Sequence, residues 1–432
     1  MAKPIADGLS AQAELVPLSE AERLNWLRLL RCDNVGPRTF ESLLRRYGSA
    51  GAALAALPGL IAKAKSARSI RIPPREEIEH EMSLIQSVGG RFLAICEPDY
   101  PPLLRHTASA PPVIAVRGNL SSLKRSLVAI VGARNASAAG LSFAAQLARG
   151  IARAGHVIVS GLARGIDGRA HEATIESGTI AVLAGGLGKI YPSEHQALVE
   201  RIVANGAIIS EMPYGWEARG RDFPRRNRIV AGLSRAVVVV EAARRSGSLI
   251  TARFAAEAGR EIFAVPGSPL DPRAEGTNDL LRDGASLCTK PEDITSFLAE
   301  QDLSQTEPGF FERNPAAAAY PPFWDELDFV EGADPPLGVP AATRADEIFG
   351  PEVEEPEIEA SLKLARHSLE DIEKCLLDLL SPAPVAVDEL ARLLQVSARQ
   401  VRTALLALKL AGKLEWHDGD LVSSVGTTGN ER

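Results

Sequence analysis

The stretch of sequence that decides the fold is residues 127–161, which read LVAIVGARNASAAGLSFAAQLARGIARAGHVIVSG. It begins with a short apolar run, Leu127–Val131, that is bounded by Gly132. Residues 141–154 then place apolar side chains at helical spacing, and residues 156–160 form a second apolar run. A strand, a helix and a strand in this order are typical of a right-handed βαβ unit, whose two strands are parallel.

The same alternation continues toward the C-terminus. Further strands are predicted at residues 179–184, 207–210, 236–240 and 261–265, and helices at residues 193–204 and 248–258. Strands that alternate with amphipathic helices build a parallel sheet covered by helices. We therefore predict the α/β class, with an extended Rossmann-like domain at residues 108–298. The composition agrees, because 45% of the residues are hydrophobic and only 5% are aromatic, which suits a core of Ala, Val, Leu and Ile.

A small helical module is predicted at residues 19–88. Ser19 is expected to cap its first helix, and Glu22 follows three residues later, as in a capping box. The sequence around Gly36 predicts a tight turn between two helices, and a second hairpin is expected at residues 57–60. Such turns can present backbone N–H groups to a DNA phosphate, but short helical pairs also form plain interaction modules. DNA contact and protein contact are both open for this module.

A winged-helix module is predicted at residues 365–424. Its three helices and its hairpin are expected at residues 372–380, 387–394, 398–411 and 413–423. The third helix would be the recognition helix, and its cations are Arg399, Arg402 and Lys409. A helix that binds the DNA groove would carry more cations, so partner binding and weak DNA contact are equally consistent with this sequence.

Charge separates the linker between these modules from the rest of the chain. Residues 301–362 are predicted to be an acidic, Pro-rich linker, since residues 301–360 hold nine prolines and 15 acidic residues against two arginines, a net charge of −13. The whole chain carries −7, so its remainder carries +6. Residues 121–235 alone hold 15 Lys and Arg against 8 Asp and Glu. A basic body on an acidic tether is compatible with a nucleic-acid partner.

The cysteines and the hydropathy indicate the compartment. No two of the four cysteines, Cys32, Cys96, Cys288 and Cys375, are close in sequence. Their spacing predicts neither a metal site nor a disulfide framework, so ordinary buried thiols are expected. No apolar stretch has the length of a signal core or a membrane span. We expect a cytoplasmic protein without a membrane partner.

The functional chemistry is expected in the loops that follow the strands, because ligands of a parallel sheet bind at the carboxyl ends of its strands. Glycine lets the backbone approach a ligand, and a helix that begins behind such a loop favours an anion. Cations from several loops at one edge suit a polyanion better than a single phosphate. The candidate DNA-binding residues in these loops are Gly132, Arg134, Ser160, Gly161, Arg164, Gly165, Gly186, Lys189, Arg225, Arg226, Asn227, Arg228, Ser246, Gly247 and Ser248.

Cofactor binding and catalysis have weaker support. The first loop lacks GxGxxG and the chain lacks GxxxxGK[ST], so neither NAD nor ATP has a fingerprint, and we predict no cofactor and no metal. Asp167, His171, Glu211 and Glu241 are the acid or base candidates, but their spacing implies no nucleophile–base pair. Asp167 is expected to cap a helix that begins at Gly168. His171 is expected to be a packed or hydrogen-bonding histidine.

The arginines of residues 225–228 have two interpretations. They form either a solvated helix face or part of a buried, shaped site. Asn227 interrupts the arginines, and Ile229 and Val230 follow them. This pattern favours the shaped site.

Together, the loops resemble the DprA/Smf family, the DNA-processing proteins of bacterial transformation. The resemblance covers essentially the whole middle domain, and the combination of motifs is highly specific although no single motif is. The matching segments are residues 130–134, 160–167 with Ala170 and His171, 191–192, 210–211, 223–234, 241–242, 246–252, 265–267 and 276–278.

The resemblance implies that the middle domain binds single-stranded DNA, loads the RecA recombinase onto it and forms a homodimer. It assigns phosphate contacts to Arg134 and Lys189. The flanking modules resemble the family's sterile-alpha-motif-like or helix-hairpin-helix piece and its winged-helix piece. Two positions depart from the usual family sequence, since Gly188 stands where Asp is usual and His195 where Asn is usual. These departures leave open the detail of the loop that follows the strand predicted at residues 179–184.

We expect the protein to act by holding DNA in position and not by catalysing a reaction. Two alternatives remain. Related Rossmann-like folds hydrolyse nucleotide N-glycosidic bonds with a Pro-Gly-Gly-x-Gly-Thr-x-x-Glu loop, but residues 266–269 lack the second glycine, and the threonine and glutamate are missing. The other alternative is a protein-binding adaptor whose basic loops fold onto the acidic linker. Tyr191 and Phe223 are the aromatic candidates near the loops. Because they are few, electrostatics is expected to dominate DNA binding.

Overall fold

The structure, a computed structural model, describes residues 15–63, 71–304 and 368–425. The described residues form two compact units. The first unit combines the residues up to Arg125 with Gly178–Ser234. The second unit combines Ser126–Ser177 with the described residues from Arg235 onward. Each unit is considered by itself below.

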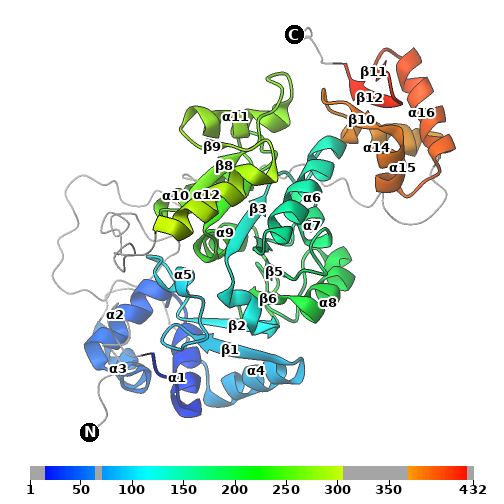
Figure 1. The fold of residues 1–432 in the computed structure, drawn as a ribbon. Coiled ribbons are helices and arrows are strands. Elements are labelled where there is room, and N and C mark those ends of the chain that lie inside the picture. The colour runs from blue at the N-terminus through cyan, green and yellow to red at the C-terminus, as the bar shows by residue number, and fades with distance from the viewer. Residues whose placement is uncertain (1–14, 64–70, 305–367, 426–432) are drawn as a thin grey trace. The chain divides into compact units, whose positions relative to one another are not determined.

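The second unit is built on five parallel strands. They are β3 (Leu127–Val131), β4 (Val157–Ser160), β7 (Ala236–Val239), β8 (Glu261–Ala264) and β9 (Ser286–Leu287). Their order is β4-β3-β7-β8-β9. Figure 1 labels β3, β8 and β9 of this sheet. The apolar runs of the sequence are these strands, because a parallel strand covered by helices is apolar along its whole length. The predicted parallel α/β class is confirmed.

Helices pack against these strands. α6 (Ala138–Arg153), α7 (Ile166–Glu172) and α12 (Pro291–Ser304) share one apolar core with side chains of β3, β4 and β7. α10 (Gly247–Glu257) packs against β7 and β8. The turn η4 (Pro272–Ala274) leads into α11 (Glu275–Arg282). The strand β9 and the helices α11 and α12 were not predicted, although they lie at the end of the predicted domain.

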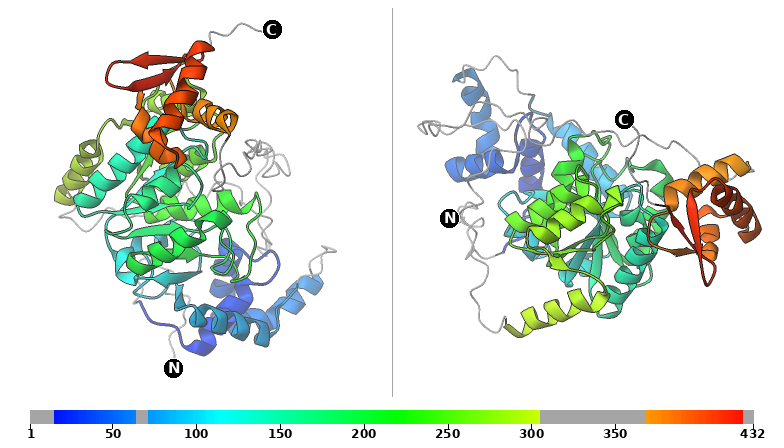
Figure 2. Two further views of the ribbon diagram at one scale, coloured as in Figure 1. Left: turned by 90° about the vertical axis from the view of Figure 1, so that its right-hand side faces the viewer. Right: turned by 90° about the horizontal axis from the view of Figure 1, so that it is seen from above.

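The second unit also contains the winged helix. Its elements are α14 (Leu369–Leu379), β10 (Val385–Ala386), α15 (Val387–Leu394), α16 (Ala398–Leu410), β11 (Leu414–His417) and β12 (Leu421–Ser424) (Figure 2). Ser368 and Ser397 begin α14 and α16 with capping boxes. The predicted winged helix is confirmed, with one additional short strand, β10, beside β12. The predicted linker lies outside the described residues from residue 305 onward.

The first unit contains a mixed sheet. Its strands are β1 (Gly90–Ala94), β2 (Val113–Gly118), β5 (Thr179–Val182) and β6 (Ala207–Ser210), in the order β1-β2-β6-β5. β2 pairs antiparallel with β1 and with β6, whereas β5 and β6 are parallel. The other helices and turns around this sheet are α5 (Pro102–Arg105), η2 (Leu120–Lys124), η3 (Ser193–His195), α8 (Gln196–Asn205) and α9 (Asp222–Leu233).

The predicted N-terminal module consists of α1 (Glu20–Leu30), α2 (Pro37–Tyr47), α3 (Ala50–Lys63) and α4 (Arg75–Ser87). Two details differ from the prediction. Ser19 does cap α1, but the Glu22 carboxylate accepts the N–H of Ala50 and so ties α1 to α3 instead of closing a capping box. The expected hairpin at residues 57–60 is wrong, because α3 continues through Pro58. The Ala-rich sequence of α3 has a high helix propensity, so the helix tolerates the loss of the hydrogen bond that proline cannot donate.

The cysteines agree largely with the sequence analysis. Cys32, Cys96 and Cys288 are buried thiols, whereas Cys375 on α14 is only half-buried, and none forms a disulfide. Burial raises the pKa of Cys32 and of Cys288 to about 12 and that of Cys96 to about 11. Across the three described ranges, no group of His, Cys, Asp and Glu has the arrangement of a metal site. No helix within those ranges has the length and hydropathy needed to cross a bilayer.

Candidate nucleic-acid interface

The first two loops of the second unit lie against each other. One loop follows β3 and carries Arg134, which is exposed, and the other follows β4 and carries Arg164, which is half-exposed. Gly165 has a φ of 70° and its α-carbon lies against the carbonyl oxygens of Ala133 and Arg134, so that a side chain here would collide with both. Only glycine satisfies this position. The two loops therefore present two arginines from one edge of the sheet, as predicted.

Asp167, a residue of α7, binds the loop that follows β4. Its carboxylate accepts the N–H groups of Gly161, at 3.0 Å, and Ala163, at 3.4 Å. The expectation that Asp167 caps its own helix is wrong, because α7 begins at Ile166 and Gly165 is the cap residue. Asp167 holds the preceding loop in place instead.

Two predicted polar residues of the second unit point into the protein. The Ser160 hydroxyl is fully buried and donates to the carbonyl of Ile130 at 2.6 Å, which ties β4 to β3. His171 is fully buried as well, as expected of a packed histidine. Gly132, at the end of β3, lies against Ile166 and lets α7 approach the sheet. These residues shape the edge that carries the arginines.

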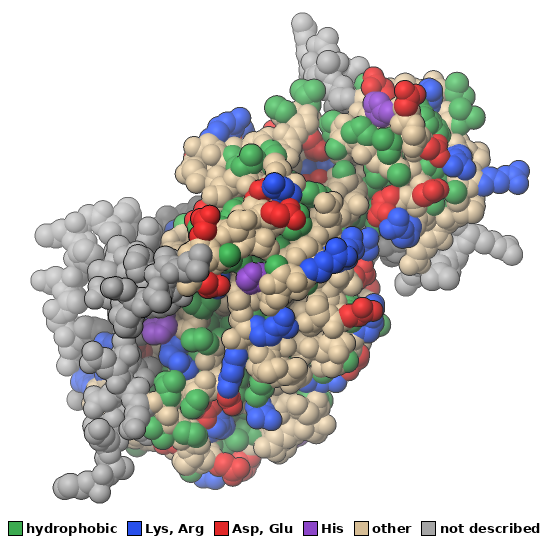
Figure 3. Space-filling view, in the orientation of Figure 1, with side chains coloured by type: hydrophobic (Ala, Val, Ile, Leu, Met, Phe, Trp, Pro, Cys, Tyr) green, Lys and Arg blue, Asp and Glu red, His purple; other side chains and the backbone are tan. Residues whose placement is uncertain are grey.

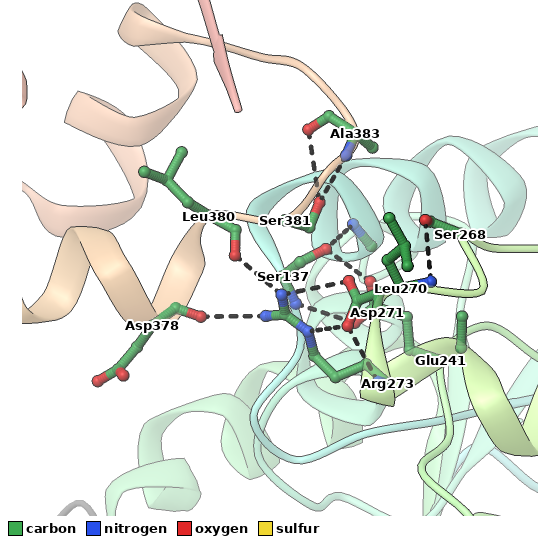
Figure 4. Close-up of polar contacts among 12 residues, drawn as sticks. Ser137, Glu241, Ser268, Leu270, Asp271, Arg273, Asp378, Leu380, Ser381 and Ala383 are labelled. Atoms are coloured by element: carbon green, nitrogen blue, oxygen red, sulfur yellow. Dashed lines mark hydrogen bonds and ion pairs between the residues drawn. The ribbon is translucent and has the colours of Figure 1, made fainter. Parts of the chain in front are cut away.

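The start of α6 is occupied by an internal carboxylate. Ser137 caps α6, and its N–H and its hydroxyl donate to Glu241 at 2.9 and 2.5 Å (Figure 4). A Cβ on Gly140 would lie 2.5 Å from the same carboxylate. Burial raises the pKa of Glu241 above its ordinary value, although hydrogen bonds from Ser137 act in the opposite direction. Glu241 thus fills the position where a Rossmann-like fold holds a nucleotide phosphate.

The start of α10, by contrast, has steric room at Gly247. Ser246 caps the helix and bonds to the hydroxyl of Ser248 at 2.8 Å. Gly247 is exposed, and a Cβ there would meet no atom within 4 Å. Within this described helix, the first turn has no acidic side chain. Of the predicted residues, 246–248 therefore form the helix start best suited to an incoming phosphate.

In the first unit, the loop that follows β5, residues 184–192, packs against residues 214–222, a segment that the sequence analysis missed. The N–H groups of Gly186 and Gly188 donate to the carbonyls of Trp216 and Tyr214, both at 2.9 Å. A Cβ on Gly188 would lie 2.6 Å from the Tyr214 ring, so the close approach of this ring favours glycine here. The backbone N–H groups of this loop thus serve the fold, and the loop's contribution to a ligand comes from side chains.

Those side chains include a cation and aromatic rings. The Lys189 side chain is 52% exposed and forms an ion pair with Glu217 at 2.9 Å. Tyr191 is 45% exposed and packs edge-on against Phe223, with ring centroids 5.4 Å apart. In the missed segment, the Arg219 guanidinium lies 4.8 Å from the Trp216 ring centroid. A Trp and an Arg in a Gly-containing stretch were the available signal for this segment.

The arginines of α9 are mostly internal. Arg226 is 6% exposed and donates to the carbonyl of Val182 at 2.6 Å and to Asn227 at 3.0 Å. Arg228 is 4% exposed, pairs with Glu211 and donates to the carbonyl of Ser109. Arg225 is half-buried, and burial lowers its pKa. The solvated-face interpretation is wrong, and the buried, shaped arrangement is the one observed.

Basic side chains are also visible on the surface of the second unit. Figure 3 shows Lys and Arg side chains in blue over α6 and α7 and onward to α15, interrupted by acidic side chains in red. One of these interruptions is defined by contacts, since Arg169 and Arg392 both pair with Glu389. The cations of this surface are therefore partly balanced by the protein itself.

This combination defines a class of protein by its fold: a Rossmann-like protein with an N-terminal helical module and a winged-helix module. Family models match the chain in the same order. They are the DprA-like N-terminal HHH domain at residues 20–83, DNA recombination-mediator protein A at residues 91–299 and the DprA winged helix domain at residues 360–420.

The chain belongs to the DprA/Smf family. It is 42% identical to DNA processing protein DprA of Bacillus subtilis over 223 residues, which are 51% of this chain and 75% of that protein. It is 42% identical to Protein Smf of Escherichia coli over 51% of this chain, a match that spans only 60% of the relative. The X-ray structure of DprA from Streptococcus pneumoniae is 31% identical, with a TM-score of 0.54, and covers 65% of this chain and 98% of that one.

Proposed function

We propose that this protein binds single-stranded DNA through its strand-end loops and loads RecA recombinase onto it, in DNA uptake and recombination. The observation that carries the proposal is that the buried polar groups and the exposed cations of these loops have different roles. Buried polar groups such as Asp167, Ser160 and Arg228 hold the loops, while Arg134 and Lys189 extend to the surface. Exposed cations on rigid loops are suited to a run of phosphates.

The exposed groups favour a single strand over a duplex. Phosphate contacts carry no sequence information, so binding should show little sequence preference. Tyr191 offers an exposed ring beside Lys189, and a base that stacks on such a ring contributes about 1–3 kcal/mol. A duplex keeps its bases stacked inside, where Tyr191 would not reach them. The three residues of 246–248 add a helix start with steric room at Gly247 to the proposed contacts.

Family membership supports the remaining parts of the proposal. RecA as the protein partner, a homodimer formed by the Rossmann-like domain and a cytoplasmic location are what the DprA/Smf family suggests. The proposed domains are residues 19–88, 108–298 and 365–424, joined by a linker at 301–362. We further propose that the protein acts by positioning DNA and not by catalysis.

The alternative of an N-glycoside hydrolase has less support from the site. Glu241, an acid candidate from the sequence, is bound to Ser137 at the start of α6. Its carboxylate occupies the position that a nucleotide phosphate would need. Release of free base from a nucleoside monophosphate by the purified protein would nevertheless restore this alternative.

The proposal is tested by fluorescence anisotropy with a labelled single strand across a salt series. Wild type should bind with a steep slope, and Arg134→Ala and Lys189→Ala should each weaken binding and flatten the log–log slope by about 0.7 per lost phosphate contact. Arg153→Ala is the matched control, because Arg153 is exposed but lies at the C-terminal end of α6, away from the strand-end loops. Unchanged binding by both loop variants would reject the proposed interface.

A further inference from the structure

The winged helix is fastened to the Rossmann-like part of the second unit by Arg273, a residue of η4. Its guanidinium donates to the carbonyl of Asp378 at 3.1 Å and to that of Leu380 at 2.8 Å (Figure 4). These carbonyls lie at the C-terminal end of α14, where the helix dipole favours a cation. The carboxylate of Asp271 accepts hydrogen bonds from Nε of the same guanidinium, at 3.1 Å, and from its Nη2, at 3.3 Å. The arginine is therefore already oriented toward the helix end.

Two further contacts join the winged helix to the Rossmann-like part. Arg169 of α7 pairs with Glu389 of α15 at 3.7 Å, and the Glu389 side chain is only 11% exposed. Ala138, the first residue of α6, is fully buried in the apolar core of the winged helix, beside side chains such as Leu376 and Leu390. Three elements of the Rossmann-like part, η4, α7 and α6, thus form a seat for the winged helix.

The seat lies beside the proposed phosphate contacts. Ala138 is four residues from Arg134, and Arg169 is five residues from Arg164 in the adjoining loop and helix. Glu389 places a carboxylate on Arg169, as a phosphate would, and it also pairs with Arg392. Arg169 also pairs with Glu172 of its own helix at 3.4 Å, so the acidic group of the winged helix further balances this cation on the surface that the proposed DNA strand would follow.

We propose that the winged helix is an intramolecular competitor of single-stranded DNA, seated on Ala138, Arg169 and Arg273 and displaced when the strand extends along this surface. This inference rests on the proposed function. The contact is suited to reversal, because it consists of one ion pair, two hydrogen bonds to carbonyls and a small apolar patch. The polar part of such a contact is weakened by salt.

The competition predicts that loosening the seat strengthens DNA binding. Arg273→Ala and Glu389→Gln should each raise the affinity for a labelled oligothymidylate about 3–10-fold, because the apparent affinity rises with the fraction of molecules whose site is open. Arg282→Ala is the matched control, since Arg282 is exposed on nearby α11 and forms its ion pair with Asp279 of the same helix. The full chain is used throughout.

Hydrogen–deuterium exchange reports the seat independently of DNA. Exchange in residues 136–145 and 376–383 should increase in Arg273→Ala and Glu389→Gln, and in wild type on addition of the oligonucleotide. Faster exchange in the variants with unchanged or weaker DNA binding would reject the competition. Unchanged exchange in both variants would reject the seat. If wild type and all variants fail to bind DNA while exchange in the variants rises, the proposed function fails and the seat stands as a structural joint without a competitor.

Discussion

Glu97 shows what a single buried carboxylate does in this molecule. It accepts the N–H groups of Leu18, at 3.2 Å, and Ala94, at 2.8 Å, and it pairs with Arg23 of α1. Burial alone would raise its pKa, but the hydrogen bonds from Arg23 and from these backbone groups lower the pKa below its ordinary value of 4.5. One side chain thus links the N-terminal segment, α1 and the end of β1.

The lowered pKa gives Glu97 a predictable pH dependence. A depressed folded-state pKa means that its stabilisation is complete above the ordinary pKa and is lost as the pH falls through the folded-state value. Glu97→Gln should lower the free energy of unfolding by about 1.5–3 kcal/mol at pH 7, with a smaller difference at pH 3. Urea denaturation at both pH values measures this. Glu79→Gln, which removes an exposed i,i+4 partner of Arg75, should change little at either pH, and an equal loss for Glu97→Gln at both would contradict the assignment.

At this scale, the sequence indicated which residues are candidates for the site, but it did not indicate which way their side chains point. Arg225, Arg226 and Arg228 were all identified from one motif, but the last two are buried against carbonyls and Glu211. A helical sequence sets the spacing of side chains, whereas the partners of a buried arginine come from strands and loops far along the chain. The prediction that Asp167 caps its own helix was wrong for the same reason, since the hydrogen-bond partners of Asp167 lie in the preceding loop and not at the helix start.

At the scale of elements, the loop between β4 and α7 depends on one backbone position. Gly165→Ala would place a methyl group against two carbonyl oxygens at a φ of 70°. We expect a loss of at least 1–2 kcal/mol in the free energy of unfolding, with weaker DNA binding, because the loops that carry Arg134 and Arg164 must separate. Thermal and urea unfolding, followed by anisotropy, measure both effects.

The control for this change is glycine in an open helical position. Gly59 lies inside α3, and a Cβ there would meet no atom within 4 Å. Gly59→Ala should therefore stabilise the protein by about 0.5–1 kcal/mol. A Gly165→Ala protein as stable as wild type would show that the two loops are not locked together in the way that we describe.

Long, strongly patterned elements were predictable, and short ones were not. The apolar runs of β3, β6 and β7 and the helices α6, α15 and α16 were identified to within a few residues, because burial leaves a continuous apolar run in such strands and a periodic pattern in helices. β9 and β10 have two residues each, too few for any period. The course of α3 through Pro58 depends on packing against α1 and α2, which local propensity does not record.

At the scale of the whole molecule, charge is distributed unevenly. The chain has a net charge of −7, although residues 121–235 hold nearly twice as many basic as acidic residues. Because an acidic segment joined to a basic body has a high local concentration near the cations, we expect it to compete with DNA at low salt. The sequence predicted this imbalance fully, because it needs only a count of residues.

This imbalance gives a test that leaves the chain length unchanged. Replacing the five glutamates of residues 352–359 by glutamine should strengthen binding to single-stranded DNA several-fold at about 0.05 M salt, and the effect should vanish near 0.5 M as screening increases. The comparison is with wild type in the same salt series. A gain that persists at high salt would indicate a specific contact by this segment instead of a general electrostatic one.

The distribution of thiols has a practical consequence for chemical labelling. A maleimide or a haloacetamide reacts with the thiolate, and burial keeps Cys32, Cys96 and Cys288 protonated and covered. Cys375 differs from them by its partial exposure, and it lies on α14, the helix whose C-terminal carbonyls Arg273 holds. The natural chain thus offers one preferred alkylation point, and it lies on the winged helix.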